Sequence, residues 1–358
     1  MGKEQKTILM TEGVIWRQIL LFSIPLILGN LLQQMYNTMD SVIVGNFVGS
    51  DALAAVGASS SLLYLLIAFS TGAATGAGVV VAQLYGAGDE KGVHDAVHTA
   101  LGIAVVLGLI LTVVGIVVSP KLLEWMNTPE DIMDQSVEYL RIYFAGVVFN
   151  VIYNMAAGIL NAVGNSKRSL LYLGIASFLN IGLDIFFIAI LKMGVAGAAF
   201  ATVFAQIIVF VLYLRAVWKE PIIFGRIHLF VRTPKEHIRE IVKIGLPSAM
   251  QDALMSMISM VIARFIAGWG DAAVAVQKVG SQIESISWMM AGGFSTAVNA
   301  FIAQNYGAGK KKRIKKGYRK AIEIMAVWGV ITTLLLWVFP EFFFKIFIKE
   351  PDVIPMGV

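Results

Sequence analysis

Residues 101–119 read LGIAVVLGLILTVVGIVVS, a stretch without a single charged side chain. An α-helix needs about 20 apolar residues to cross the ~30 Å hydrocarbon layer of a bilayer, and this stretch has that length. Other apolar segments, bounded by glycine, proline or charge, predict nine spans. They lie near residues 15–45, 53–84, 93–119, 133–162, 168–190, 195–217, 239–267, 273–305 and 317–347. The predicted fold class is an all-α integral membrane bundle.

The composition points the same way. Of the 358 residues, 58% are hydrophobic and only 14% are charged, far from the balance of a soluble domain. Cysteine is absent, which excludes a disulfide framework and a thiol nucleophile. The sequence also lacks a GxxxxGK[ST] phosphate loop and an HExxH pair, so it predicts neither an enzyme nor a nucleotide-driven pump.

Basic residues alternate between the predicted loops. One set of loops carries Lys3, Lys6 and Arg17, then Lys91, then Lys167 and Arg168, then Lys219, Arg226, Arg232, Lys235 and Arg239, then Lys310, Lys311, Lys312, Arg313, Lys315 and Lys316. The opposite loops hold little beyond Lys121, Lys192, Lys345 and Lys349. Basic loops face the cytoplasm, so we expect a multi-pass protein of the plasma membrane with a cytoplasmic N-terminus. This explains the net charge of +5 better than nucleic-acid binding does.

The chain contains an internal repeat. AQLYGAG at 82–88 recurs as AQNYGAG at 303–309, an offset of 221 (303 minus 82), and four other landmarks keep offsets of 220 to 222. We therefore predict two lobes related by a parallel repeat: an N-lobe at 1–217 with six helices, a cytoplasmic linker at 218–238, and a C-lobe at 239–358 with three. Three helices of the second copy are missing by this comparison, so we expect a C-terminally truncated form of a twelve-helix protein.

Several of these motifs resemble the multidrug and toxic compound extrusion (MATE) family of cation-coupled exporters. The resemblance rests on IPLILGNLLQQMYNTMD at 24–40, VG at 44–45, AAVG at 54–57 and QNYGAG at 304–309. It covers the whole chain but only about nine of the family's twelve helices. It implies a two-lobed transporter that exports small molecules against an ion gradient.

Acidic side chains within spans are rare because each costs about 2.5–3.5 kcal/mol on insertion. Asn180 and Asp184 are four residues apart and share one helix face. The resemblance implies that Asp40, Asn180, Asp184 and Thr202 form a cation site in the N-lobe, and that Glu284 is an acid of the C-lobe. No metal site or cofactor is expected other than H⁺ or Na⁺ as the coupling ion, and the sequence leaves open which of the two it is.

Other polar or flexible residues within the spans are candidates for substrate binding. Gln33, Tyr36, Asn37 and Asn154 either line a polar cavity or form bonds between helices. Asp252 either lines the cavity or makes a local hydrogen bond. Met255 occupies the position at which one branch of the family carries a glutamate, which puts that branch's C-lobe sodium site in doubt. Methionine-rich surfaces such as this one suit varied substrates.

These observations predict a cation-coupled antiporter that exports cationic, partly apolar small molecules. The alternative is a flippase for lipids or lipid-linked saccharides with a related architecture. The expected partners are the small-molecule substrate and the bilayer, with no nucleic acid and no obligate protein partner.

Overall fold

A computed structural model describes residues 9–126, 128–219, 235–269 and 271–347. Within these ranges, nine helices are long and apolar enough to cross a membrane, which confirms the predicted number. The helices are α1 (Ile15–Phe47), α2 (Ser50–Ala87), α3 (Glu90–Trp125), α4 (Glu130–Ala162), α5 (Ser166–Asp184), α6 (Gly194–Lys219), α7 (Lys235–Ala267), α8 (Asp271–Gly307), α9 (Lys311–Val338) and α10 (Pro340–Phe347). A π-helical segment, η1 (Ile185–Ile190), continues α5.

Two predicted boundaries differ from the structure. The ninth helix ends at Val338 and not near residue 347, because Pro340 opens the separate short helix α10. Proline fits the first turn of a helix and cannot continue one. Most of the predicted linker, residues 220–234, lies outside the described residues, and its flanks are helical: residues 218–219 end α6 and residues 235–238 begin α7.

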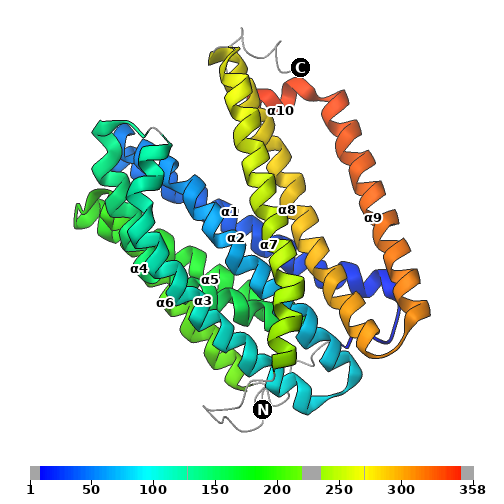
Figure 1. Ribbon diagram of the computed structural model, residues 1–358. Helices are drawn as coiled ribbons and strands as arrows, with labels where there is room; N and C mark the ends of the chain where they lie inside the picture. The colour runs from blue at the N-terminus through cyan, green and yellow to red at the C-terminus, as the bar shows by residue number, and fades with distance from the viewer. Residues whose placement is uncertain (1–8, 127, 220–234, 270, 348–358) are drawn as a thin grey trace.

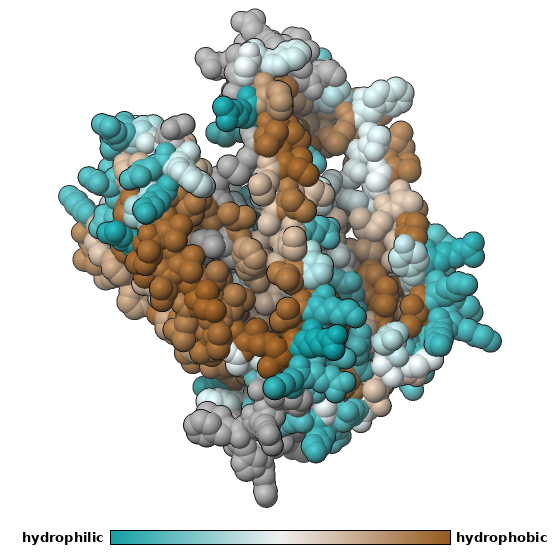
Figure 2. All heavy atoms as spheres, in the orientation of Figure 1, coloured by the Kyte–Doolittle hydropathy of each residue, from teal (hydrophilic) through white to brown (hydrophobic). Residues whose placement is uncertain are grey.

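The N-lobe is built around α4, which packs against α2, α3 and α6. Its core is apolar and includes the fully buried Leu140, Val151 and Met155. The outer side of α3 exposes Val113 and Val117, as expected of side chains that face lipid. Figure 2 shows hydrophobic residues gathered across the middle of the N-lobe and hydrophilic residues toward its ends.

The described helices form two lobes that meet along one seam (Figure 1). α1 packs against α8 of the other lobe, and α2 packs against α7 and α8. In the first contact, Phe22 and Leu26 of α1 join Phe294 and Phe301 of α8 in a small apolar cluster. The α1–α8 and α2–α7 contacts are exchanged by the internal repeat, so the seam has the pseudo-two-fold symmetry that the repeat predicts.

The closest approach of the lobes occurs where α2 and α8 end. A Cβ atom at Gly86 would overlap the backbone carbonyl of Gln304, and a Cβ atom at Gly307 would overlap that of Gln83. These two contacts are again related by the offset of 221. Both positions therefore need glycine for backbone to pack on backbone.

Residues 9–14, which we call the N-terminal strap, fasten the same end of the bundle. The Met10 backbone N–H donates to Gln304 Oε1 at 2.8 Å, and Gln304 Nε2 donates to the Ala162 carbonyl at 2.7 Å. The Arg313 guanidinium donates to the carbonyls of Met10, Glu12 and Gly13. The lobes are thus closed at the end that carries the strap, and they diverge toward the opposite end (Figure 1).

Candidate functional site

Helix α5 delivers two polar side chains to the interior of the N-lobe. Asn180 is 3% exposed and Asp184 is 0% exposed, and both belong to the buried face of the helix. Asp184 is the last α-helical residue before η1. Such π-helical turns often occur at functional sites, because the wider turn shifts the register of the side chains around it.

A second buried carboxylate comes from α1. Asp40 is 8% exposed and lies close enough to Asp184 for the two groups to interact electrostatically. Tyr139 of α4 is within electrostatic range of both acids. The structure therefore brings together Asp40, Asn180 and Asp184 from two helices.

This cluster has unused hydrogen-bonding capacity. Both carboxylate oxygens of Asp184, both side-chain polar atoms of Asn180, Oδ1 of Asp40 and Oε1 of Gln206 are buried and have no hydrogen-bond partner among the described residues. Most buried polar groups in proteins are satisfied, and buried charges are paired or neutralised. A proton or a small cation held between these oxygen atoms would satisfy them.

A small cavity of about 30 Å³ adjoins the cluster, with room for a water molecule or one ion. Its polar lining comes from Tyr36, Tyr153, Asn180, Thr202 and Gln206. Thr202 of α6 and Asn180 of α5 thus line the same cavity. Gln206 was missed, although it is one turn beyond Thr202, and its Nε2 donates to the Tyr143 hydroxyl at 3.3 Å.

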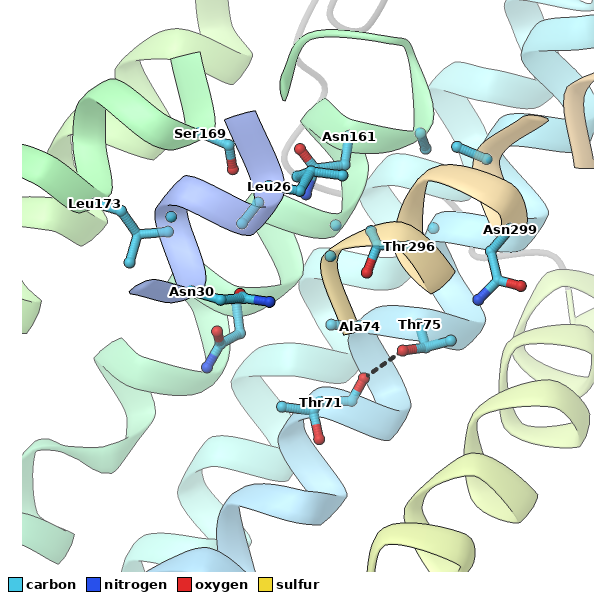
Figure 3. Close-up of a pocket in the computed structure, with 18 of the residues that line it drawn as sticks. Leu26, Asn30, Thr71, Ala74, Thr75, Asn161, Ser169, Leu173, Thr296 and Asn299 are labelled. Atoms are coloured by element: carbon cyan, nitrogen blue, oxygen red, sulfur yellow. Dashed lines mark hydrogen bonds between the residues drawn. The ribbon is translucent and has the colours of Figure 1, made fainter. Parts of the chain in front are cut away.

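A larger cavity of about 290 Å³ lies between the lobes (Figure 3). Its polar lining consists of amides and hydroxyls: Asn30, Gln33, Thr71, Thr75, Asn154, Asn161, Ser169, Thr296 and Asn299. None of the described residues that line it is charged. Asn161 Oδ1 is buried without a hydrogen-bond partner among the described residues, so it remains available to a ligand.

The proposed substrate residues divide between these two cavities. Gln33 and Asn154 line the central cavity, whereas Tyr36 lines the small one. Asn154 also donates to Asn150 Oδ1 at 2.8 Å, so it both lines the cavity and bonds within its helix. Asn37 is half-buried on α1 and lines neither cavity.

The C-lobe candidates lie elsewhere. Glu284 is exposed on α8, where it accepts a hydrogen bond from Trp288 Nε1 at 2.9 Å. Asp252 is exposed on α7, within hydrogen-bonding reach of the Thr71 hydroxyl, and Met255 is exposed one turn farther along. None of the three lines either cavity. The polar residues of α8 that do line the central cavity, Thr296 and Asn299, were not predicted.

Comparisons with known proteins agree with this architecture. The profile of the MatE family matches residues 25–186 and 247–358. A probable multidrug resistance protein of Bacillus subtilis strain 168, YpnP, is 31% identical over 348 residues, which is 97% of this chain and 78% of that protein. The probable multidrug resistance protein NorM of Thermotoga maritima is 25% identical over 350 residues, 95% of this chain and 74% of that protein.

Solved structures show the same fold. One, described as the outward-facing conformation of a multidrug resistance MATE family transporter of the MOP superfamily, has a TM-score of 0.87 and 26% identity, and covers 99% of this chain and 80% of that one. Another, described as MATE in the bent conformation, has a TM-score of 0.90 and 26% identity. The match covers 99% of this chain and 79% of that one. Because the family profile spans most of this sequence and the fold matches throughout, the chain belongs to the MatE family of multi-pass membrane transporters.

Proposed function

We propose that this protein exports cationic, partly apolar small molecules in exchange for H⁺ or Na⁺ across the plasma membrane. The observation that carries the proposal is the buried cluster of Asp40, Asn180 and Asp184, whose polar atoms lack partners among the described residues. Two neighbouring carboxylates away from water resist being charged together. They therefore favour a shared proton or a bound cation, and either ion can be exchanged as the site opens and closes.

The central cavity is proposed as the place for the substrate. Its amides and hydroxyls offer hydrogen bonds in several directions, and residues such as Leu26, Val79 and Leu173 supply apolar wall. A site for anionic lipid headgroups would need basic side chains. None of the described residues that line this cavity is basic. The relatives reported above are described as multidrug resistance proteins, so they give no support to the flippase alternative.

Helix α1 is proposed to link the two sites. It carries Asp40 at the ion cluster and Asn30 at the central cavity, where Asn30 Nδ2 donates to the Met289 carbonyl of the C-lobe at 3.1 Å. Pro25 within α1 removes one backbone hydrogen bond and lets the helix bend. Neutralising Asp40 and Asp184 would favour a different packing of α1 and so shift the balance between conformations.

The orientation follows from the basic loops. With the N-terminus in the cytoplasm, the end closed by the N-terminal strap is the inner end, and the lobes diverge toward the outside. Similarity to a structure described as outward-facing supports this assignment. The described conformation is then the one that takes up the coupling ion and releases substrate.

Transport measured in proteoliposomes tests the proposal. The protein should accumulate a cationic dye when either a proton gradient or a sodium gradient is imposed alone, because the cluster binds one of these ions in exchange for substrate. The same vesicles without a gradient, but with ATP, serve as the control. Equal accumulation with and without each gradient would exclude ion coupling.

Leu173 gives a second prediction, because it lines both cavities. Replacing it with alanine removes the side chain that separates them, so ion and substrate are expected to leak independently. We expect the number of ions moved per substrate to rise severalfold. Leu171→Ala, an exposed leucine on the same helix, is the control. An unchanged ion-to-substrate ratio in Leu173→Ala would show that Leu173 does not separate the two pathways.

A further inference from the structure

The repeated motif at the contact between the lobes holds two polar residues that the exchange mechanism does not use. Gln304 and Asn305 of α8 are both 0% exposed. The two copies of the motif, at 82–88 and 303–309, differ at one position, where the second copy has Asn305 and the first has Leu84. Buried amides are costly unless they are hydrogen-bonded, so the partners of these two side chains indicate what they do.

The Gln304 side chain joins three parts of the molecule. It extends from α8 of the C-lobe, and its Oε1 accepts from the Met10 backbone N–H of the N-terminal strap at 2.8 Å. Its Nε2 donates to the Ala162 carbonyl, at the end of α4 in the N-lobe, at 2.7 Å. A flipped amide would set its NH₂ group against the Met10 N–H and its oxygen against the Ala162 carbonyl. The Met10 N–H therefore holds the Gln304 amide in the one orientation that can donate to the N-lobe.

The N-terminal strap is anchored to the C-lobe through Met10. The Met10 side chain is 0% exposed, in the apolar cluster that includes Phe294 and Phe301 of α8. Its carbonyl accepts from Asn305 Nδ2 at 3.2 Å. Asn305 thus binds the strap, and Leu84 in the first copy of the motif has no donor for such a bond.

The rest of the strap is held by the start of α9. Lys310 Nζ donates to the Thr11 carbonyl at 3.0 Å. The Arg313 guanidinium donates to the Glu12 carbonyl at 2.7 Å and to the Gly13 carbonyl at 2.8 Å. Hydrogen bonds from charged donors are stronger than neutral ones. Several of them together hold the strap on the C-lobe more firmly than one neutral bond can hold the lobes to each other.

Fewer polar contacts connect the two lobes at this end. Among the described residues, the bond from Gln304 Nε2 to the Ala162 carbonyl is the one hydrogen bond that joins α8 to the helices α2 to α6. The close approach at Gly86 and Gly307 is a backbone contact without a hydrogen bond. Separation of the lobes must therefore break the bond between Gln304 and Ala162, whereas the bonds of the strap can stay intact.

We propose that Gln304 is the gate residue of the inner end, and that the strap positions its amide and stays on the C-lobe when the gate opens. The strap keeps the amide ready to bond Ala162 again, so the lobes can close without rearrangement of the strap. The proposal rests on the proposed alternation between two conformations. It adds the bond that breaks and forms again in each cycle.

Gln304→Glu tests the gate, because the protonation of its carboxyl group decides whether it can donate. The protonated acid offers an O–H to Ala162 and a carbonyl to Met10, as glutamine does. The ionised acid can accept from Met10 but has no proton for Ala162. We expect the ratio of open to closed inner ends to rise about tenfold between about pH 5 and about pH 9, relative to the parent protein at the same pH. The distance between spin labels on Lys91→Cys of α3 and Lys311→Cys of α9 measures this ratio.

The controls separate the gate bond from other effects of pH. The parent protein corrects for the acids of the ion cluster and for Glu12, Lys310 and Arg313 near the strap, which the variant shares. Gln83→Glu is the matched control and should follow the parent at each pH. Gln83 is the counterpart of Gln304 in the repeat, and its side chain makes no hydrogen bond to the C-lobe among the described residues. Gln304→Met, which cannot donate, should favour the open inner end by about tenfold at every pH.

A second experiment leaves the gate amide in place and asks whether the strap must detach. A short bismaleimide links the exposed positions Glu12→Cys and Lys310→Cys, which fixes the strap to the C-lobe. The same reagent links Ala87→Cys to Ala308→Cys across the lobes, where a Cβ atom on Gly307 would lie 3.1 Å from the Ala87 nitrogen. Export of a cationic dye should stay within about twofold of the unlinked protein for the strap link, and fall at least about tenfold for the link across the lobes.

Three results would overturn the proposal. A closed inner end and a pH response like the parent's in Gln304→Glu would show that the bond to Ala162 does not hold the gate. An equal response in Gln83→Glu would assign the effect to any charge at the lobe contact. Equal loss of export with both links would show that the strap leaves the C-lobe in each cycle. Because the spin-label distances need neither substrate nor coupling ion, failure of the gate is distinguished from failure of the proposed exchange.

Discussion

Asp184→Asn is expected to abolish ion-driven accumulation of substrate. The asparagine side chain cannot release a proton or offer a charged ligand, and Asp184 is fully buried beside Asp40. A membrane potential of 100 mV provides about 2.3 kcal/mol per translocated charge, which sustains an accumulation of roughly fifty-fold. Without coupling, a proton or sodium gradient imposed at zero membrane potential should leave the inside and outside concentrations of the substrate equal. The measurement is the accumulation of a cationic dye by vesicles that contain the variant, after insertion of the variant into the membrane has been confirmed.

A neutral amide resembles the protonated acid, so the variant should still exchange labelled for unlabelled substrate when no gradient is present. This retained exchange separates loss of coupling from misfolding. Asp131→Asn, at an exposed position in the first turn of α4, is the matched control and should transport as the parent does. If Asp184→Asn and Asp40→Asn both keep parental accumulation and ion dependence, the cluster does not couple transport, and Glu284 becomes the next candidate.

The second large effect is expected from Gly86→Ala combined with Gly307→Ala. Each new methyl group would overlap a backbone carbonyl of the opposite lobe, at Gln304 and at Gln83. Overpacking typically costs 1–3 kcal/mol, and here the contact is with backbone that cannot rotate away. The closed inner end should lose at least about tenfold in population, and export should fall because the outward-facing state becomes rare.

The opening of the inner end can be measured with spin labels. Because the sequence contains no cysteine, introduced cysteines are the only sites that react with the label. Labels at the exposed positions Lys91 and Lys311 should report a single short distance in the parent and a longer one in the double variant. Gly57→Ala and Gly280→Ala on the same two helices are controls, because nothing lies within 4 Å of a Cβ atom at either position. Unchanged distances in Gly86→Ala/Gly307→Ala would mean that this contact does not set the conformation.

Much of the fold could be predicted because it follows from local patterns. The spans follow from apolar runs of membrane length, and the pairing of Asn180 with Asp184 follows from helix periodicity. The ninth helix was predicted too long because an apolar run continues past Pro340, and hydropathy alone does not register the break. The internal repeat indicates that the two lobes share one plan of contacts. It also relates Thr75 to Thr296, which both line the central cavity, at an offset of 221.

The site was harder to predict where it depends on which helices become neighbours. Gln206 and Tyr139 reach the ion cluster only because α4 and α6 pack together, and neither residue stands out in its own helix. Glu284 and Asp252 were chosen as acids within spans, yet both are exposed on the C-lobe helices. Charge within a span identifies a candidate, but the facing helix decides whether it is enclosed.

The N-terminal strap has a consequence for biosynthesis. Met10 bonds to Gln304, 294 residues later in the chain, so the strap leaves the ribosome long before its binding site exists. At about 5–20 residues per second, that interval is roughly 15 to 60 s. Helices α2 to α6 can enter the membrane and pack around α4 during this time. The strap then docks only after α8 and the start of α9 have emerged, which makes closure of the inner end a late step in assembly of this part of the chain.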